Sequence, residues 1–374
     1  MRRNAVYLGL LILYTQVAFA QSSVTLYGLL SEGIGWVNNE GGAHNFKMES
    51  GSNQNTRFGL KVTEDLGAGT RAIAQLENGF DITSGKFQQG GRMFGRLAYV
   101  GLANDSLGSV TLGRQYDMFW DYLTPLVPAA AANGLAANPG DADNLMGSWR
   151  YSNSVKYVSP SIRGITAEGL YAFSNSADSF SMNRAFSAGI GYENSRFKIA
   201  AAFVELDRPG TANASGAVSD DYASAPFFLF RTSPLNRNIG VDRQRNFAVG
   251  GRYDFGPLRW NVIVDRVQFR YLDGTSLDLT NYDTSFSYYV TPALVLGVAY
   301  IYSQGKYGGG VNARPHWNTG QASIDYLLSK RTDVYLYDTF QQVSGSYAVA
   351  DIYGNAPSTS RNQNMLMAGI RHRF

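Results

Sequence analysis

Four carboxylates stand out because they share one stretch of the chain, residues 113–150, with a run of alanine and leucine. Such a segment is apolar enough to pack on another protein surface, yet its acids need water or cations nearby. Charged side chains around a narrow aqueous passage set its ion preference, so the chemistry open to these residues is electrostatic selection. The four acids are Asp117, Asp121, Asp141 and Asp143.

The length of this stretch decides how it can be placed. The alternation of apolar and polar residues found on both sides stops between Asp117 and Trp149. The interval is too long for a hairpin turn, and long connections without regular structure are usually functional or disordered. We interpret residues 117–149 as a loop folded inside a β-barrel, where it narrows a water-filled pore. A large external loop is the alternative.

Catalytic chemistry finds less support in the sequence. A nucleophile needs a base within reach, often histidine, and the only histidines are His44, His316 and His372. Their positions suggest no Ser-His-acid arrangement, and no spacing typical of metal ligands is present. We therefore expect no catalytic residue, metal or cofactor. The formal net charge of +3 also argues against a nucleic-acid binder.

The N-terminus has the pattern of a secretory signal peptide. Arg2 and Arg3 precede a short apolar core, and Ala18-Phe19-Ala20 fits the small-x-small cleavage rule. We expect residues 1–20 to be removed and residues 21–374 to form one domain. No later apolar run is long enough for a transmembrane helix, and cysteine is absent.

Transmembrane β-strands would position the charged residues. Such strands are about 9–11 residues long, with one apolar face and one polar face. Residues 57–65 show this pattern, since apolar side chains alternate with Arg57, Lys61 and Thr63. Sixteen such segments can be counted, joined alternately by short turns and long connections, which predicts an all-β, sixteen-stranded antiparallel transmembrane barrel. The long connections include 39–55, 117–149, 207–242, 270–280 and 345–360.

Charges in the middle of these strands should face the water-filled interior. A cation on the lipid face near the membrane centre costs roughly 2–4 kcal/mol. The polar positions carry more bases than acids, which predicts a weak preference for anions, although the loop acids could cancel it. The bases are Arg57, Lys61, Arg150, Lys156, Arg252 and Arg259, and the acids are Glu168, Asp265, Asp283 and Asp325.

Several blocks together resemble one protein family. They are SSVTLYGLL at the mature start, Asn55–Phe80, Gly95–Asp117, Trp149–Pro160, Leu328–Tyr335 and the ending GIRHRF. In this order they are similar to the trimeric general porins of Gram-negative outer membranes, and most of all to the betaproteobacterial branch. Each block is weakly specific, but the set spans nearly the whole mature chain.

The resemblance implies a location, partners and an activity. It implies a multi-pass protein of the outer membrane, with the third long loop folded into the lumen. The chain would form a homotrimer that contacts outer-membrane lipid and lipopolysaccharide and is inserted by the barrel assembly machinery. Ions and small hydrophilic solutes would cross it by passive diffusion.

The resemblance also assigns residues to the pore. Arg57 in TRFGLK, Arg114 in LGRQYD and Arg150 in WRYSNS match the family's basic wall, and Lys61 shares the polar face of Arg57. Arg114 shares its parity with Val110 and Leu112, so its placement depends on the resemblance or on a kink at Gly113. The loop lacks the Pro-Glu-Phe-Gly-Gly run of enterobacterial porins. Asp117 and Asp121 are therefore the first candidates for the acidic side, followed by Asp141 and Asp143.

The end of the chain carries a separate signal. Phe374 closes an alternating segment at the last position and resembles the residue that outer-membrane assembly machinery reads. An aromatic residue that simply ends a strand is the alternative.

Other functions of the same fold stay open. Phe119, Trp120 and Tyr122 could stack sugars in a substrate-specific channel, or could pack the loop against the wall. A barrel enzyme or an adhesin using the 207–242 insert is less favoured.

Overall fold

The computed structural model describes residues 22–209, 213, 215–218, 221–222 and 229–374. The expected signal peptide, residues 1–20, lies outside the described residues. The strands are β1 (Ser23–Glu40), β2 (Ala43–Ser50), β3 (Arg57–Gly67), β4 (Thr70–Gly79), β5 (Leu97–Asn104), β6 (Gly108–Gln115), β7 (Tyr151–Val158), β8 (Ile165–Ala172), β9 (Arg184–Glu193), β10 (Phe197–Asp207), β11 (Val241–Phe255), β12 (Leu258–Tyr271), β13 (Ser276–Tyr289), β14 (Leu294–Gly308), β15 (His316–Leu327), β16 (Thr332–Ser344) and β17 (Asn362–Arg373).

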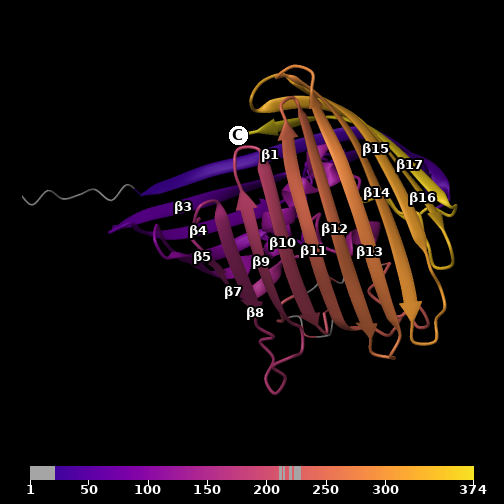
Figure 1. Cartoon of the computed structure of the whole chain (residues 1–374), viewed down its shortest axis with the longest axis horizontal. Helices are drawn as coiled ribbons and strands as arrows, with labels where there is room; N and C mark the ends of the chain where they lie inside the picture. Colours follow the sequence, from indigo (N-terminus) through magenta and orange to yellow (C-terminus); the bar gives the residue numbers. More distant parts are fainter. Residues whose placement is uncertain (1–21, 210–212, 214, 219–220, 223–228) are drawn as a thin grey trace, which may run out of the picture.

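These strands occupy sixteen positions around a closed antiparallel barrel. The first half of β1 pairs with β3 and its second half pairs with β2, so β2 and β3 share one position. Pairing of β17 with β1, where Leu29 lies opposite Arg373, closes the barrel. Every other strand pairs with its neighbours in sequence. The predicted sixteen-stranded barrel is thus confirmed, and Figure 1 shows its strands slanting around the interior.

Side-chain alternation separates the two surfaces of the wall. Along β11 and β14, Val249 and Val298 are each 53% exposed on the outer surface. Asn246 and Asn281, on the inner surface, are fully buried. Apolar residues outside and polar residues inside are the pattern of a barrel that crosses a membrane. Among the described residues, no helix is long and apolar enough to cross a membrane.

The barrel wall is uneven in height. Strands β5, β6, β7 and β8 have 8 residues each, whereas β11, β12, β13 and β14 have 14 or 15. The connection between β6 and β7, residues 116–150, packs inside the barrel and supplies much of its apolar core. That core joins Phe119 and Leu123 of the connection to Ile263 on the inner wall. The prediction that this loop folds into the lumen is confirmed.

Two of the predicted long connections contain strand residues and are wrong as drawn from the sequence. Residues 39–55 instead form most of a hairpin, because Gly41 and Gly42 adopt positive φ angles and turn β1 directly into β2. Residues 270–280 instead contain the tight turn from β12 to β13. The start of β13 reverses the expected pattern, since Leu277 and Leu279 are buried inside. This reversed alternation at the strand end does not match a lipid-facing strand, which is why the sequence pattern predicts a loop there.

Candidate pore constriction

The connection 116–150 (the inner loop) is built from short helical turns rather than strands. They are η1 (Phe119–Leu123), η2 (Thr124–Leu126), α1 (Pro128–Ala131) and η3 (Pro139–Asp141). Prolines at the first position of α1 and η3 and at the second position of η2 suit helix starts because their missing N–H would have no helical partner there. The turns give a compact segment that can follow the curved inner wall.

Glycines on β9 let the inner loop approach the wall closely. A Cβ atom at Gly191 would lie 2.7 Å from the Tyr122 ring. A Cβ atom at Gly189 would lie 2.8 Å from Met118 Cβ and from the same ring. Contacts this short are not tolerated, so glycine is required for the packing. Phe119 and Tyr122 therefore pack the loop against the wall. Of the two interpretations of these aromatic residues, packing applies to them and sugar stacking does not.

Polar side chains of β11, β13 and β15 fasten the rest of the inner loop. Gln244 Nε2 donates to the carbonyl of Ala142 at 2.7 Å, and Asn246 Nδ2 donates to the carbonyl of Asp143 at 3.1 Å. The amide N–H of Ala136 donates to Gln321 Oε1 at 2.8 Å. Loop carbonyls that would otherwise be buried without partners are satisfied in this way. Further bonds join Ser287 to Ala131, and Ser323 to Ala132.

Three of the four loop acids are completely buried. Asp117 Oδ2 accepts the Tyr151 hydroxyl at 2.8 Å, and burial raises the pKa of Asp117 to about 6. Asp141 accepts the amide of Met146 at 2.9 Å, and burial together with Asp143 raises its pKa well above the ordinary value. Burial also raises the pKa of Asp143. These acids hold the loop together and do not face the lumen.

Asp121 is the exception among the loop acids. Its side chain keeps 29% of its surface exposed and forms an ion pair with Lys156 of β7. Lys156 also lies 3.7 Å from Glu168 of β8. The negative charge of Asp121 is therefore largely balanced by the wall.

Two wall acids lie behind the inner loop. Asn138 Nδ2 lies 3.2 Å from Asp265 Oδ2 and 3.4 Å from Asp283 Oδ2, and it also donates to Asp143. Asp265 and Asp283 are 2% and 3% exposed. The sequence placed both acids on the lumen side, and the structure shows that the loop covers them there.

One predicted arginine, Arg150, lies beside an aromatic ring together with Arg96, and a second predicted arginine, Arg57, joins Arg96 through Glu77. The Arg150 guanidinium lies 4.8 Å from the Tyr116 ring centre, and Arg96 lies 5.9 Å from it. Arg57 Nε and Arg96 Nε lie 3.6 and 2.6 Å from Glu77 carboxylate oxygens. Arg57 is 19% exposed, whereas Arg150 is only 2% exposed. Arg57 is therefore the member of this group that can reach the lumen, and sequence reasoning missed Arg96.

The other two predicted bases lie apart from that ring. A bulge at Gly113, with φ of 140°, turns Arg114 inward, as the kink alternative anticipated. Arg114 then forms an ion pair with Asp221 of the 207–242 insert and donates to Gly95 O at 2.8 Å. Lys61 is exposed, with its ammonium 4.9 Å from the Tyr27 ring centre.

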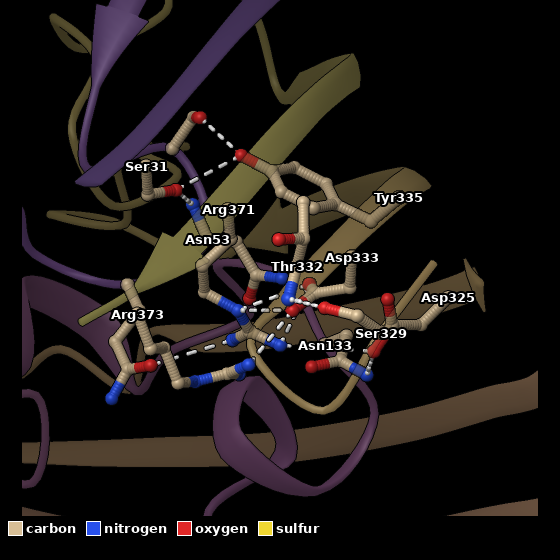
Figure 2. A network of polar contacts seen from close by, with 12 residues as sticks. Ser31, Asn53, Asn133, Asp325, Ser329, Thr332, Asp333, Tyr335, Arg371 and Arg373 are labelled. Atoms are coloured by element: carbon tan, nitrogen blue, oxygen red, sulfur yellow. Dashed lines mark hydrogen bonds and ion pairs between the residues drawn. The ribbon is translucent and has the colours of Figure 1, made fainter. Parts of the chain in front are cut away.

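Sequence reasoning also missed Arg371 and Arg373 on the inner face of β17. Figure 2 shows both converging on Asp333 of β16. Arg371 Nε and Arg373 Nη1 donate to that carboxylate at 3.0 and 2.9 Å. They alternate with Ile370, His372 and Phe374, the positions that carry the chain-end signal. The opposite parity of the same segment was the signal that could have found them.

These residues border a cavity of about 410 Å³ inside the barrel. Residues 51–56, between β2 and β3, fold inward to form part of its lining. Ser52 Oγ lies 2.6 Å from the Tyr335 hydroxyl, and Thr56 Oγ1 donates to Ser31 O at 3.0 Å. Within the described residues, the charged side chains of this lining are Arg371 and Arg373. The cavity therefore lies between the inner loop and a part of the wall that carries two guanidinium groups.

Comparisons with known proteins agree with this architecture. A sequence profile of Gram-negative porins matches residues 8–346. An outer membrane porin protein of Bordetella pertussis is 29% identical over 100% of both chains. An anion-selective porin from Comamonas acidovorans matches with a TM-score of 0.76 and 21% identity, over 95% of this chain and 100% of that one. The trimer form of OmpT, an outer membrane protein of Vibrio cholerae, matches with a TM-score of 0.67 and 14% identity, over 94% and 99%. The chain belongs to the Gram-negative porins and is an outer-membrane channel.

Proposed function

We propose that this porin passes ions and small hydrophilic solutes by diffusion with a weak preference for anions. The observation that carries the proposal is the unequal exposure of the two charge signs. Asp117, Asp141 and Asp143 are buried in the inner loop, and the loop covers Asp265 and Asp283. The cavity lining presents guanidinium groups instead. Exposed charges govern the ion preference of an aqueous pore more strongly than buried, hydrogen-bonded ones.

The predicted basic residues divide into two roles under this proposal. Arg57 and Lys61 contribute to the positive potential of the lumen because their side chains retain exposure. Arg114 and Arg150 are buried and support the wall. Asp121 is the loop acid that moderates the preference, since it is partly exposed but paired with Lys156. The name of the Comamonas structure, an anion-selective porin, supports the same sign of selectivity.

The assembly proposals follow from the family. We propose a homotrimer, supported by the fold shared with the trimer form of OmpT, and contact with outer-membrane lipid and lipopolysaccharide. Residues 1–20 act as a cleaved signal peptide, and residues 21–374 form the barrel with 117–149 as its constriction loop. The fold and family point to a channel, and we infer that the chain is not an enzyme.

Phe374 is proposed as the signal for the barrel assembly machinery. Its amide and carbonyl both bond to Gly28 at 3.0 Å, and its ring covers that glycine. Deletion of Phe374 should lower the amount of assembled protein in outer membranes, measured by heat-modifiable mobility on gels. Normal assembly would show that the residue only ends a strand.

The function is tested with purified protein in planar bilayers under a KCl gradient. Stepwise conductance is expected, with a zero-current potential of the sign that marks faster passage of chloride. A potential of the opposite sign would reject anion preference while leaving the channel intact. Absence of conductance from correctly folded protein would reject the open passage.

A further inference from the structure

The cavity between the inner loop and β17 has two chemically different faces. One face is basic and polar, formed by Arg371, Arg373 and the inward segment 51–56. The opposite face comes from the inner loop and is mostly apolar, with Thr124 and Asn133 as its polar members. A passage for fully hydrated ions needs only the first face, so the second requires its own explanation.

The basic face is held in a fixed geometry. Arg371 contacts Asp333 through both Nε and Nη2 at 3.0 Å, and its Nη1 donates to Gln54 Oε1 at 3.4 Å. Asp333 is 1% exposed, whereas the Arg373 side chain is 38% exposed. The carboxylate therefore lies behind the guanidinium groups and aligns them (Figure 2). Preorganised guanidinium groups are well suited to binding carboxylates because they offer paired N–H donors.

The apolar face is equally well defined. Ala129 and Ala130 belong to α1, and Leu135 and Met146 flank it in the inner loop. Trp120 completes this face and is fixed by stacking on Tyr116, with ring centres 4.1 Å apart. The cavity volume of about 410 Å³ lies within the range of small-molecule sites, about 300–1,000 Å³.

We propose that the cavity is a binding site for amphipathic organic monoanions, meaning small carboxylates with an aromatic or branched apolar body. The carboxylate contacts Arg373 and Arg371, and the body covers the face formed by Ala130 and Met146. Chloride and acetate use the basic face but leave the apolar face in water. Polyhydroxylated anions such as gluconate would lose hydration against it. This inference rests on the proposed anion preference and specifies which organic anions the pore favours.

The test compares organic anions as inhibitors of chloride current. Sodium benzoate, acetate or gluconate is added to purified porin in planar bilayers, and the concentration that halves the chloride current is measured. Benzoate is expected to act at about tenfold lower concentration than acetate, because burial of its ring adds apolar contact. Gluconate is expected to be weaker than benzoate. Equal potency of benzoate and acetate would overturn the proposal.

Variants separate the two faces. Ala130→Asn, at an exposed position of α1, and Met146→Gln, of similar size, should bring the inhibitory concentration of benzoate close to that of acetate, each measured relative to the variant's own chloride current. Arg373→Gln should raise the concentrations of both benzoate and acetate that halve the chloride current. Lys330→Gln removes an exposed cation from the adjacent turn and should change neither potency. If benzoate still inhibits at a lower concentration than acetate in both Ala130→Asn and Met146→Gln, the proposed role of the apolar face is rejected.

The outcome for selectivity is read separately. The zero-current potential of the unaltered protein is measured under a KCl gradient without organic anions. If it shows anion preference and benzoate has no advantage, the proposed function stands and this site does not exist. If it shows cation preference, the proposed function itself fails.

Discussion

The inner surface of the barrel has two regions that look alike in sequence and differ in what covers them. We call the inner faces of β9 to β15 the covered wall, because the inner loop packs on them. We call the inner faces of β1, β3 and β17 together with residues 51–56 the open wall, because part of it borders the cavity. Both alternate apolar and polar residues, but the inner loop covers Asp265 and Asp283 on the covered wall, whereas the Arg373 side chain on the open wall stays exposed.

The difference teaches that a lumen-facing charge is not always a pore-lining charge. Counting polar positions along the strands gives weight to Asp265 and Asp283, yet both lie behind the loop. Their side chains bond to Asn138 and Asn281 instead of ions in transit. On the open wall, Asp333 is hidden and the Arg373 guanidinium is exposed. The charge presented to the passage is therefore more positive than a count of the charged residues at polar strand positions would give.

The largest expected effect comes from separating the inner loop from the covered wall. Gly189→Val would place a side chain against Met118 and Tyr122, where a Cβ atom alone lies 2.8 Å away. Overpacking of this kind costs about 1–3 kcal/mol. The thermal unfolding temperature should fall, and the surviving channels should show a larger single-channel conductance.

Gly320→Val is the matched control for this substitution. Gly320 also lies within a strand, but no atom is within 4 Å of the position of its Cβ. The control should retain both unfolding temperature and conductance. Equal effects of the two substitutions would show that Gly189 is not required for close approach of the loop.

A second effect, confined to a limited pH range, is expected from the titration of the loop acids. The pKa of Asp117 is raised to about 6 from an ordinary value of 3.8, so the folded protein retains a proton that the unfolded chain has lost between these values. Stability should therefore fall as the pH rises from about 4 to about 6, by up to roughly 3 kcal/mol. The unfolding temperature, measured across this range in detergent, reports the change.

Asp117→Asn isolates the contribution of this carboxyl. It should remove part of the decline, while Asp141 and Asp143, whose pKa values are also raised, retain theirs. The asparagine side chain can still accept the Tyr151 hydroxyl. If the unfolding temperature of Asp117→Asn depends on pH as in the unaltered protein, protonation of Asp117 does not contribute to the stability of the packed loop.

Sequence reasoning succeeded where a single physical constraint determines the structure. Strands that face lipid and water must alternate, which made the sixteen strands and the inner loop predictable. It failed where tertiary packing overrides that constraint. Leu277 and Leu279 point inward at the end of β13, and residues 51–56 fold inside because Tyr335 and Ser31 bind them.

The candidate site was predictable to a smaller extent for the same reason. Arg57 and Arg150 could be placed inside by parity, but parity does not report burial, and Arg150 is nearly inaccessible. Arg96 precedes β5 and lies outside regular alternation. Arg371 and Arg373 lie on the polar parity of β17, where the alternation indicates the inner face but does not indicate which neighbours the side chains contact.

The most direct test compares one charge from each wall. The zero-current potential under a KCl gradient is measured for Asp283→Asn, on the covered wall, and Arg373→Gln, on the open wall, with single-channel conductance as a check that the loop is in place. The account predicts that Asp283→Asn leaves the potential unchanged and that Arg373→Gln shifts it toward cations. Shifts of similar size in the two variants, or a shift only in Asp283→Asn, would contradict it.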